Sequence, residues 1–179
     1  MRLFRLGAIS KDQRGFTLLE TILAILIAGI ICSAATGTTF QIIAWQSKTN
    51  TSLVATAEMD SAMFWVSRDT QASQRVTLDP GPSGLPLVLA RIEWDGTTHE
   101  VTYRIDQDKL YRDYTIDGTL QDSFVVAQHI VYDEDSTYPD KTSVRFEDDL
   151  LSFSVMVTVD GFRPTTQTRV ISVFSRPKS

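Results

Sequence analysis

The sequence has one cysteine, Cys32, and two histidines, His99 and His129, in 179 residues. A single cysteine excludes an internal disulfide framework and a thiolate zinc site, and we expect it to be an inert apolar residue. The chain also lacks a glycine-rich phosphate loop, an H-E-x-x-H motif and a G-x-S-x-G motif. We therefore expect a protein that is not an enzyme and that has no cofactor.

Basic charge is scarce and unevenly distributed. The net charge is −5 and the pI about 5.0, which disfavours a nucleic-acid partner. Residues 1–15 carry four basic residues and one acidic residue, a net charge of +3, whereas residues 36–179 carry 13 basic and 20 acidic residues, a net charge of −7. A basic, then apolar, then acidic order predicts an N-terminus in the cytoplasm, a single pass through the inner (cytoplasmic) membrane and a periplasmic or extracellular domain.

Between these two regions lies an apolar segment, residues 16–35, with Glu20 as its only charge. About 20 helical residues span a hydrocarbon core roughly 30 Å thick, so this segment predicts a membrane helix. A removable secretory signal is the alternative, with Ser33-Ala34-Ala35 as its cleavage site.

Glu20 is the feature that an ordinary signal or anchor does not explain, because a carboxylate in such a segment costs roughly 2.5–3.5 kcal/mol. If the chain were cut after Gly15, Phe16 would carry a new amine four residues before Glu20. The amine of a neighbouring subunit could then neutralise the carboxylate during lateral packing of the helices.

The segment Arg14-Gly15-Phe16-Thr17-Leu18-Leu19-Glu20 resembles the signal of type IV pilins and pseudopilins. The resemblance implies that a prepilin peptidase cuts between Gly15 and Phe16 and methylates Phe16, which would leave 179 − 15 = 164 residues. It implies that Glu20 guides assembly. The implied partners are that peptidase, other pilin or pseudopilin subunits, an inner-membrane assembly platform and the lipid bilayer before assembly.

A long helix is predicted after this signal, from residue 17 to about residue 74, because no proline occurs between Phe16 and Val76. In its second half an expected sheet-facing stripe recurs at three to four residue steps: Leu53, Ala57, Ser61, Phe64 and Arg68. In its first half three small residues follow at intervals of four: Gly29, Ser33 and Gly37. These small residues either let subunits pack closely or are simply tolerated in a membrane helix.

The second half of the chain predicts an antiparallel meander of short strands with X-Gly turns. The expected strands are Leu87–Trp94, Glu100–Ile105, Lys109–Ile116, Phe124–Tyr132, Ser143–Phe146, Leu150–Val159 and Gln167–Phe174. His129 falls in one of these strands and His99 directly before another, and both are expected as surface or packed side chains. The expected core or cross-strand aromatics are Trp94, Tyr103, Tyr111 and Phe153. The fold class is therefore α+β, a long N-terminal helix packed on an antiparallel β-sheet domain.

Four regions follow from this organisation. We expect residues 1–15 to be a leader, cleaved as the resemblance implies, residues 16–37 a transmembrane or filament-core helix, residues 38–76 its continuation on the sheet, and residues 77–179 a β-rich periplasmic or extracellular domain.

Two further features have alternative interpretations. The acidic loop offers calcium candidates in Asp133, Asp135 and Asp140, although the spacing is not that of an EF-hand and charge runs are usually solvated. Arg68-Asp69 could be a buried pair, an interface pair or a solvated helix terminus.

A finer resemblance concerns the segments Phe64–Asp69, Val101–Arg104 and Leu110–Arg112, which are similar to J-type minor pseudopilins of type II secretion and to W-type minor pilins. The chain lacks the C-terminal cysteines of disulfide-looped major pilins, which favours a minor subunit at the tip or start of a filament. The alternative is a membrane-anchored β-domain that binds an extracellular sugar, calcium or DNA.

Overall fold

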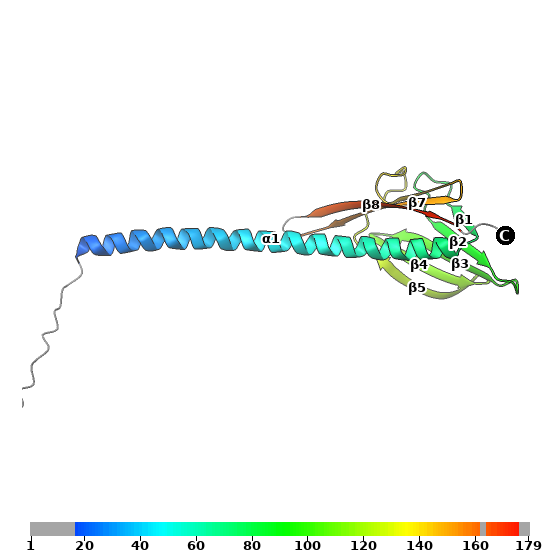
Figure 1. Cartoon of the computed structure of the whole chain (residues 1–179), viewed down its shortest axis with the longest axis horizontal. Helices are drawn as coiled ribbons and strands as arrows, with labels where there is room; N and C mark the ends of the chain where they lie inside the picture. The colour runs from blue at the N-terminus through cyan, green and yellow to red at the C-terminus, as the bar shows by residue number, and fades with distance from the viewer. Residues whose placement is uncertain (1–16, 162–163, 176–179) are drawn as a thin grey trace, which may run out of the picture. The chain divides into compact units, whose positions relative to one another are not determined.

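The computed structural model describes residues 17–161 and 164–175 of the chain (Figure 1). Two compact units make up the chain, residues 1–43 and residues 44–179. Helix α1 begins at Leu18 and ends at Ala72, so 55 residues form one helix, as predicted from the lack of proline. The expected leader, residues 1–15, and Phe16 lie outside the described residues.

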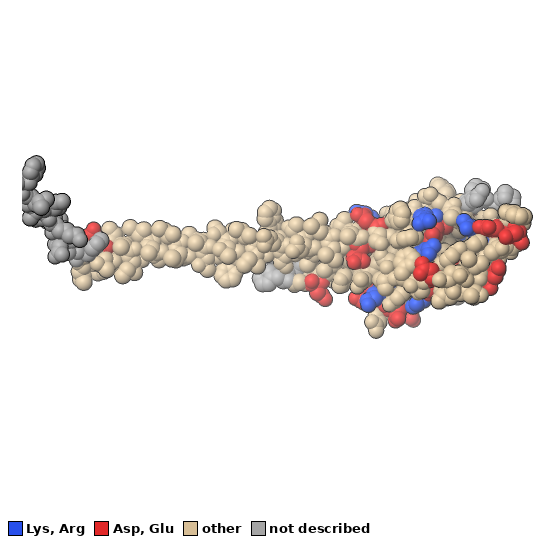
Figure 2. Space-filling view, turned by 90° about the horizontal axis from the view of Figure 1, so that it is seen from below, with Lys and Arg blue, Asp and Glu red and all other residues tan. Residues whose placement is uncertain are grey.

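In the first unit, α1 is apolar on all sides and its side chains are exposed. By length and composition this part of the helix could cross a membrane, and no side chain in its most apolar window is buried. Figure 2 shows this stretch of the helix uncharged except at its start, where Glu20 lies. A helix that is apolar on every side is stable in lipid or among other apolar helices, and not in water.

The second unit contains two antiparallel sheets, which confirms the α+β class. The five-stranded sheet has the order β1-β2-β3-β4-β5, with β1 Arg75–Leu78, β2 Leu87–Ile92, β3 Thr98–Asp106, β4 Lys109–Ile116 and β5 Thr119–Ala127. The three-stranded sheet has the order β6-β7-β8, with β6 Ser143–Glu147, β7 Leu150–Val159 and β8 Thr165–Phe174. The predicted single meander is thus divided in two, and the division falls at the acidic loop that follows β5.

Within this unit α1 lies between the two sheets (Figure 1). On one side, the Ser61 hydroxyl donates a hydrogen bond to the carbonyl oxygen of Val126 at the end of β5. On the other side, Gln167 of β8 donates to the Ser52 hydroxyl and accepts from the Thr56 hydroxyl. The helix therefore supplies part of the core of both sheets.

The buried face of α1 is not the one predicted. The residues that pack into the core are Ala55, Met59, Ala62, Met63 and Val66. The expected stripe faces solvent instead: Leu53, Ala57, Phe64 and Arg68 are exposed, and Ser61 is half-buried. Both stripes have helical spacing, and small alanines with flexible methionines let the helix approach two sheets more closely than leucine and phenylalanine would.

The loop between β1 and β2 of the five-stranded sheet contacts the three-stranded sheet. The backbone N–H of Val144 in β6 donates to the carbonyl oxygen of Ser83, at 2.8 Å, in the loop between β1 and β2. The next residue, Gly84, has a φ of +70°, and a Cβ atom there would lie 2.4 Å from the Val144 oxygen. Only glycine permits both this backbone conformation and this approach.

Three sequence expectations about the strands are wrong. β5 is displaced, because it covers Thr119–Ala127 rather than Phe124–Tyr132. His129 consequently lies after the strand, where its positive φ of 59° is incompatible with a ladder. Trp94 is 97% exposed in the turn between β2 and β3, whereas Tyr103 and Phe153 are fully buried as expected.

Core packing makes a direct prediction about stability. Leu87 of β2 is fully buried, and Leu87→Ala should lower the free energy of unfolding by about 2–5 kcal/mol through lost burial and a cavity. Leu120→Ala makes the same chemical change at a position 58% exposed on β5, and should change it by less than about 0.5 kcal/mol. Denaturant unfolding of the full chain in detergent micelles measures both, and equal losses would contradict the packing described.

Candidate functional site

The N-terminal end of α1 places Glu20 in the first helical turn. Thr17 precedes the helix, and its side-chain oxygen accepts a hydrogen bond from the backbone N–H of Glu20 at 3.3 Å. Thr-x-x-Glu is the sequence of a capping box, and an acidic residue in the first turn is favoured by the helix dipole. Glu20 therefore suits the start of a helix in addition to its predicted role in assembly.

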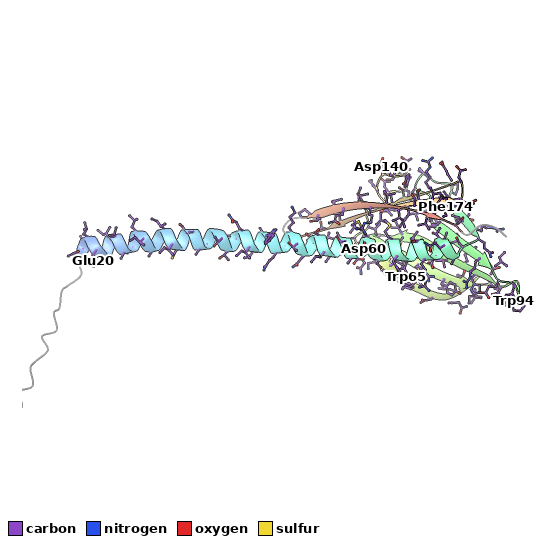
Figure 3. All side chains as sticks on the ribbon, in the orientation of Figure 1. Glu20, Asp60, Trp65, Trp94, Asp140 and Phe174 are labelled. Carbon is purple, nitrogen blue, oxygen red and sulfur yellow. The ribbon has the colours of Figure 1, made fainter. Side chains whose placement is uncertain are left out.

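The carboxylate of Glu20 is exposed within the described part of the chain (labelled in Figure 3). Its predicted partner, the amine of Phe16 on a neighbouring subunit, and the cleavage site after Gly15 fall outside that part. The pairing and the cleavage stay predictions.

The three small residues of the first unit, Gly29, Ser33 and Gly37, are exposed on the helix. A Cβ atom at either glycine would meet nothing within 4 Å, and the Ser33 hydroxyl donates to the carbonyl oxygen of Ile30 at 2.9 Å. Their spacing puts them near one face, where another helix could approach closely. A role in subunit packing also stays a prediction.

In the second unit a buried carboxylate, Asp69, connects the end of α1 to the five-stranded sheet. Arg112 of β4 donates to it through Nε at 2.7 Å and through Nη2 at 3.2 Å, and the Tyr103 hydroxyl of β3 donates at 2.5 Å. The Asp69 side chain is 9% exposed and that of Arg112 is 12% exposed. A two-point arginine–carboxylate pair of this kind fixes geometry as well as charge.

Burial and the neighbouring charges change how this cluster titrates. Burial raises the pKa of Tyr103 well above its usual value, and the charge of Asp69 and the hydrogen bond to it raise that pKa further. Burial lowers the pKa of Arg112, but the hydrogen bond and charge of Asp69 more than offset this and the net change is upward. Arg112 thus stays charged and Tyr103 stays protonated over the physiological range.

Aromatic rings surround the guanidinium groups of the cluster. The central guanidinium carbon of Arg112 and that of Arg68 each lie 5.1 Å from the ring centroid of Trp65. The ring of Phe124 meets Trp65 edge to face, with centroids 5.2 Å apart. Such contacts hold a cation by cation–π attraction and restrict its rotation.

A histidine–tyrosine pair lies on the same face of the five-stranded sheet. His99 Nδ1 and the Tyr114 hydroxyl are hydrogen-bonded at 2.6 Å, and the two rings are stacked. His99 Nε2 lies 3.3 Å from a carboxylate oxygen of Glu93, which also pairs with Arg91. His99 is therefore a packed histidine of β3, one of the two alternatives expected from the sequence.

The acidic loop after β5 places its three calcium candidates at the surface (Asp140 is labelled in Figure 3). Asp133 accepts from Lys141 Nζ at 2.6 Å and from the backbone N–H of Asp135 at 3.2 Å. The hydrogen bond with Lys141 is the main reason why the pKa of Asp133 is lowered. Across residues 17–161 and 164–175, no three His, Cys, Asp or Glu side chains are grouped to hold a metal ion. Calcium binding here stays a prediction.

The Asp69–Arg112 pair is the feature that sequence reasoning missed. The sequence leaves open whether Arg68-Asp69 is a buried pair, an interface pair or a solvated helix terminus. In the structure Arg68 is exposed, and Asp69 is buried and pairs with a residue 43 positions away. The hairpin turn at Gln107-Asp108 could have predicted part of this cluster. If Asp106 pairs with Lys109 across the turn, the antiparallel register places Tyr103 opposite Arg112. Alternation then puts both side chains on one face of the sheet.

Comparison with known proteins gives one finding. Residues 10–36 match the family model described as the prokaryotic N-terminal methylation motif. The match contains Gly15, Phe16 and Glu20, so the chain carries a type IV pilin-like signal, and its apolar helix is consistent with a membrane-anchored pilin. No curated protein and no solved structure matches the chain.

The raised pKa of Tyr103 predicts how stability depends on alkaline pH. Above about pH 10 the unfolded chain loses this proton while the folded chain keeps it, so the free energy of unfolding falls as pH rises. The expected contribution is up to about 1.4 kcal/mol per pH unit. Tyr103→Phe should remove this contribution to the pH dependence, while Arg112 still binds Asp69.

The measurement is the slope of unfolding free energy between about pH 9 and pH 11, from denaturant titrations of the full chain in micelles. A Tyr103→Phe slope equal to that of the wild type would assign the alkaline loss to another group.

Proposed function

We propose that this chain is a minor subunit of a type II secretion pseudopilus or of a type IV pilus, and that it acts when the filament starts or at its tip. The observation that carries the proposal is the methylation motif at residues 10–36, which overlaps the start of an apolar helix with no buried side chains in its most apolar window. Such a signal and helix suit a protein that inserts in a membrane and later packs laterally with similar helices.

The proposed mechanism begins with a precursor whose basic leader stays in the cytoplasm. A prepilin peptidase removes the leader after Gly15 and methylates the amine of Phe16. Glu20 then attracts the amine of a neighbouring subunit, where low dielectric strengthens the attraction and also makes an unpaired charge costly. Helices in which Glu20 is paired with the amine of a neighbour then assemble, and the β-domain faces outward.

The outward face of α1 in the second unit also supports a role in packing. Leu53 is 63% exposed and Phe64 is 60% exposed on the helix surface that neither sheet covers. Asp60 lies between them in sequence and pairs with Arg169 of β8. A neighbouring subunit could therefore pack along this face without disturbing the core.

The choice of a minor subunit rests on the three segments with the finer resemblance. They contribute Asp69, Tyr103 and Arg112, which form one hydrogen-bonded cluster although they come from α1, β3 and β4. Because the three segments contact one another in this cluster, they have a physical reason to carry the resemblance together.

Processing gives the first test. When the chain is expressed with a prepilin peptidase, mass spectrometry of the mature protein should find Phe16 at its N-terminus with one added methyl group. An intact leader would favour an anchored ligand-binding domain instead, and a start at Thr36 would favour a ligand-binding domain released by a secretory signal. Gly15→Leu should block the cut, because the peptidase must accept the residue before it, whereas Gly7→Leu should leave it unchanged.

Glu20 gives the second test. Glu20→Gln keeps the size of the side chain and removes its charge, so the variant should be cleaved normally but should co-purify with partner subunits about tenfold less. Glu134→Gln is the control, because it removes one exposed glutamate of the β-domain. Normal assembly of the Glu20→Gln chain in a pull-down after cross-linking would show that the ion pair is not needed.

A further inference from the structure

A cavity of about 370 Å³ lies in the second unit where α1 ends over the five-stranded sheet. Its apolar walls come from the helix and from three strands: Trp65, Leu89, Val101 and Phe124. The helix residues that line the cavity, Trp65, Arg68, Asp69 and Ala72, belong to the last turns of α1, which ends at Ala72. The cavity is therefore the part of this sheet face that the helix leaves uncovered, and it has the size of a small-ligand site.

Three guanidinium groups line this cavity, those of Arg68, Arg91 and Arg112. Two carboxylates line it as well, Asp69 and Asp122. Asp69 accepts hydrogen bonds from Arg112 and Tyr103, and Arg91 forms an ion pair with Glu93. Two of the lining charges, Arg68 and Asp122, belong to none of the ion pairs of the described residues, and Arg68 is the cation among them.

The hydrogen-bond donors in the cavity point to an acidic ligand. Arg112 binds Asp69 through Nε and Nη2, so its Nη1 makes no hydrogen bond to that carboxylate. Arg68 is exposed, and its contact with Trp65 holds the guanidinium at the cavity. Two oriented guanidinium groups next to apolar walls suit a carboxylate attached to an apolar group.

A sugar fits these walls less well. Sugars commonly stack on a free aromatic face, but the Trp65 ring already has Arg68 and Arg112 each at 5.1 Å from its centroid. The Tyr114 ring is stacked on His99. The aromatic faces of the cavity are thus engaged by other side chains, whereas its N–H donors and its aliphatic side chains are available.

We propose that this cavity binds the carboxyl terminus of a peptide whose last residue is apolar. A terminal residue carries its carboxylate and its side chain on the same carbon, so the carboxylate can meet Arg68 and Arg112 while the side chain packs against Leu89, Val101 and Phe124. The rest of the peptide leaves through the mouth, where Arg68 and Asp122 are exposed. The proposal does not depend on filament assembly.

Tryptophan residues give a direct measurement, because the chain has three and only Trp65 lines the cavity. The full chain, labelled with 5-fluorotryptophan in detergent micelles, should give three fluorine signals, assigned through Trp45→Phe and Trp94→Phe. Titration with acetyl-Gly-Gly-Phe as the free acid should shift the Trp65 signal and leave the other two in place.

Three other peptides test what the cavity recognises. The C-terminal amide of the same peptide should bind at least about tenfold more weakly, because it lacks the charge. The free acid of acetyl-Gly-Gly-Lys should also bind more weakly, because its side chain is cationic. Equal binding of the amide would overturn the proposal, and stronger binding of the amide of acetyl-Phe-Glu-Phe would overturn it in favour of an internal acidic segment.

Two arginine variants complete the test. Arg68→Gln removes an exposed charge at the cavity and should weaken binding of the free acid by about tenfold, while the amide binds as before. Arg75→Gln removes an exposed arginine whose strand register puts it on the other face of the sheet from Leu89, and it should leave binding unchanged. Unaltered binding by the Arg68→Gln chain, or equal weakening by both variants, would overturn the proposed site.

Discussion

The buried pair between Asp69 and Arg112 is the interaction on which the arrangement of the second unit depends. It fixes the last turns of α1 over the middle of the five-stranded sheet, and the Tyr103 hydroxyl completes the coordination of the carboxylate. A charge buried in this way is tolerated only when its partners are in place. Positions of the helix on the sheet that separate Asp69 from Arg112 are therefore disfavoured. The cavity beyond the helix end exists because that position is fixed.

The same helix meets two different environments along its length. In the first unit its apolar side chains are exposed and its start carries one acid, Glu20. In the second unit small and flexible side chains on one face fill the space between two sheets, and larger apolar side chains remain on the other. This combination suits the proposed filament subunit, because each part can keep its structure while its surroundings change.

Local patterns predicted more than long-range ones. The absence of proline predicted the extent of α1 to within two residues, and alternation with X-Gly turns predicted the strands from β2 to β4 and from β6 to β8. The buried helix face was mispredicted, because Leu53 and Phe64 are more apolar than Ala55 and Ala62 and sequence alone does not show how close the sheets come. The sequence left open whether Asp69 is paired or solvated, since its partner Arg112 becomes adjacent only after β3 and β4 pair.

The contacts of β8 with α1 differ in kind from those of the five-stranded sheet. Thr165 and Gln167 meet the helix through hydroxyl and amide groups, and Arg169 meets it through Asp60 at the surface. Water can replace such contacts at little cost, whereas it cannot replace the packing around Val66 and Tyr103. We therefore expect local opening of the second unit to begin at these polar contacts between β8 and α1, while the five-stranded sheet stays packed on the helix.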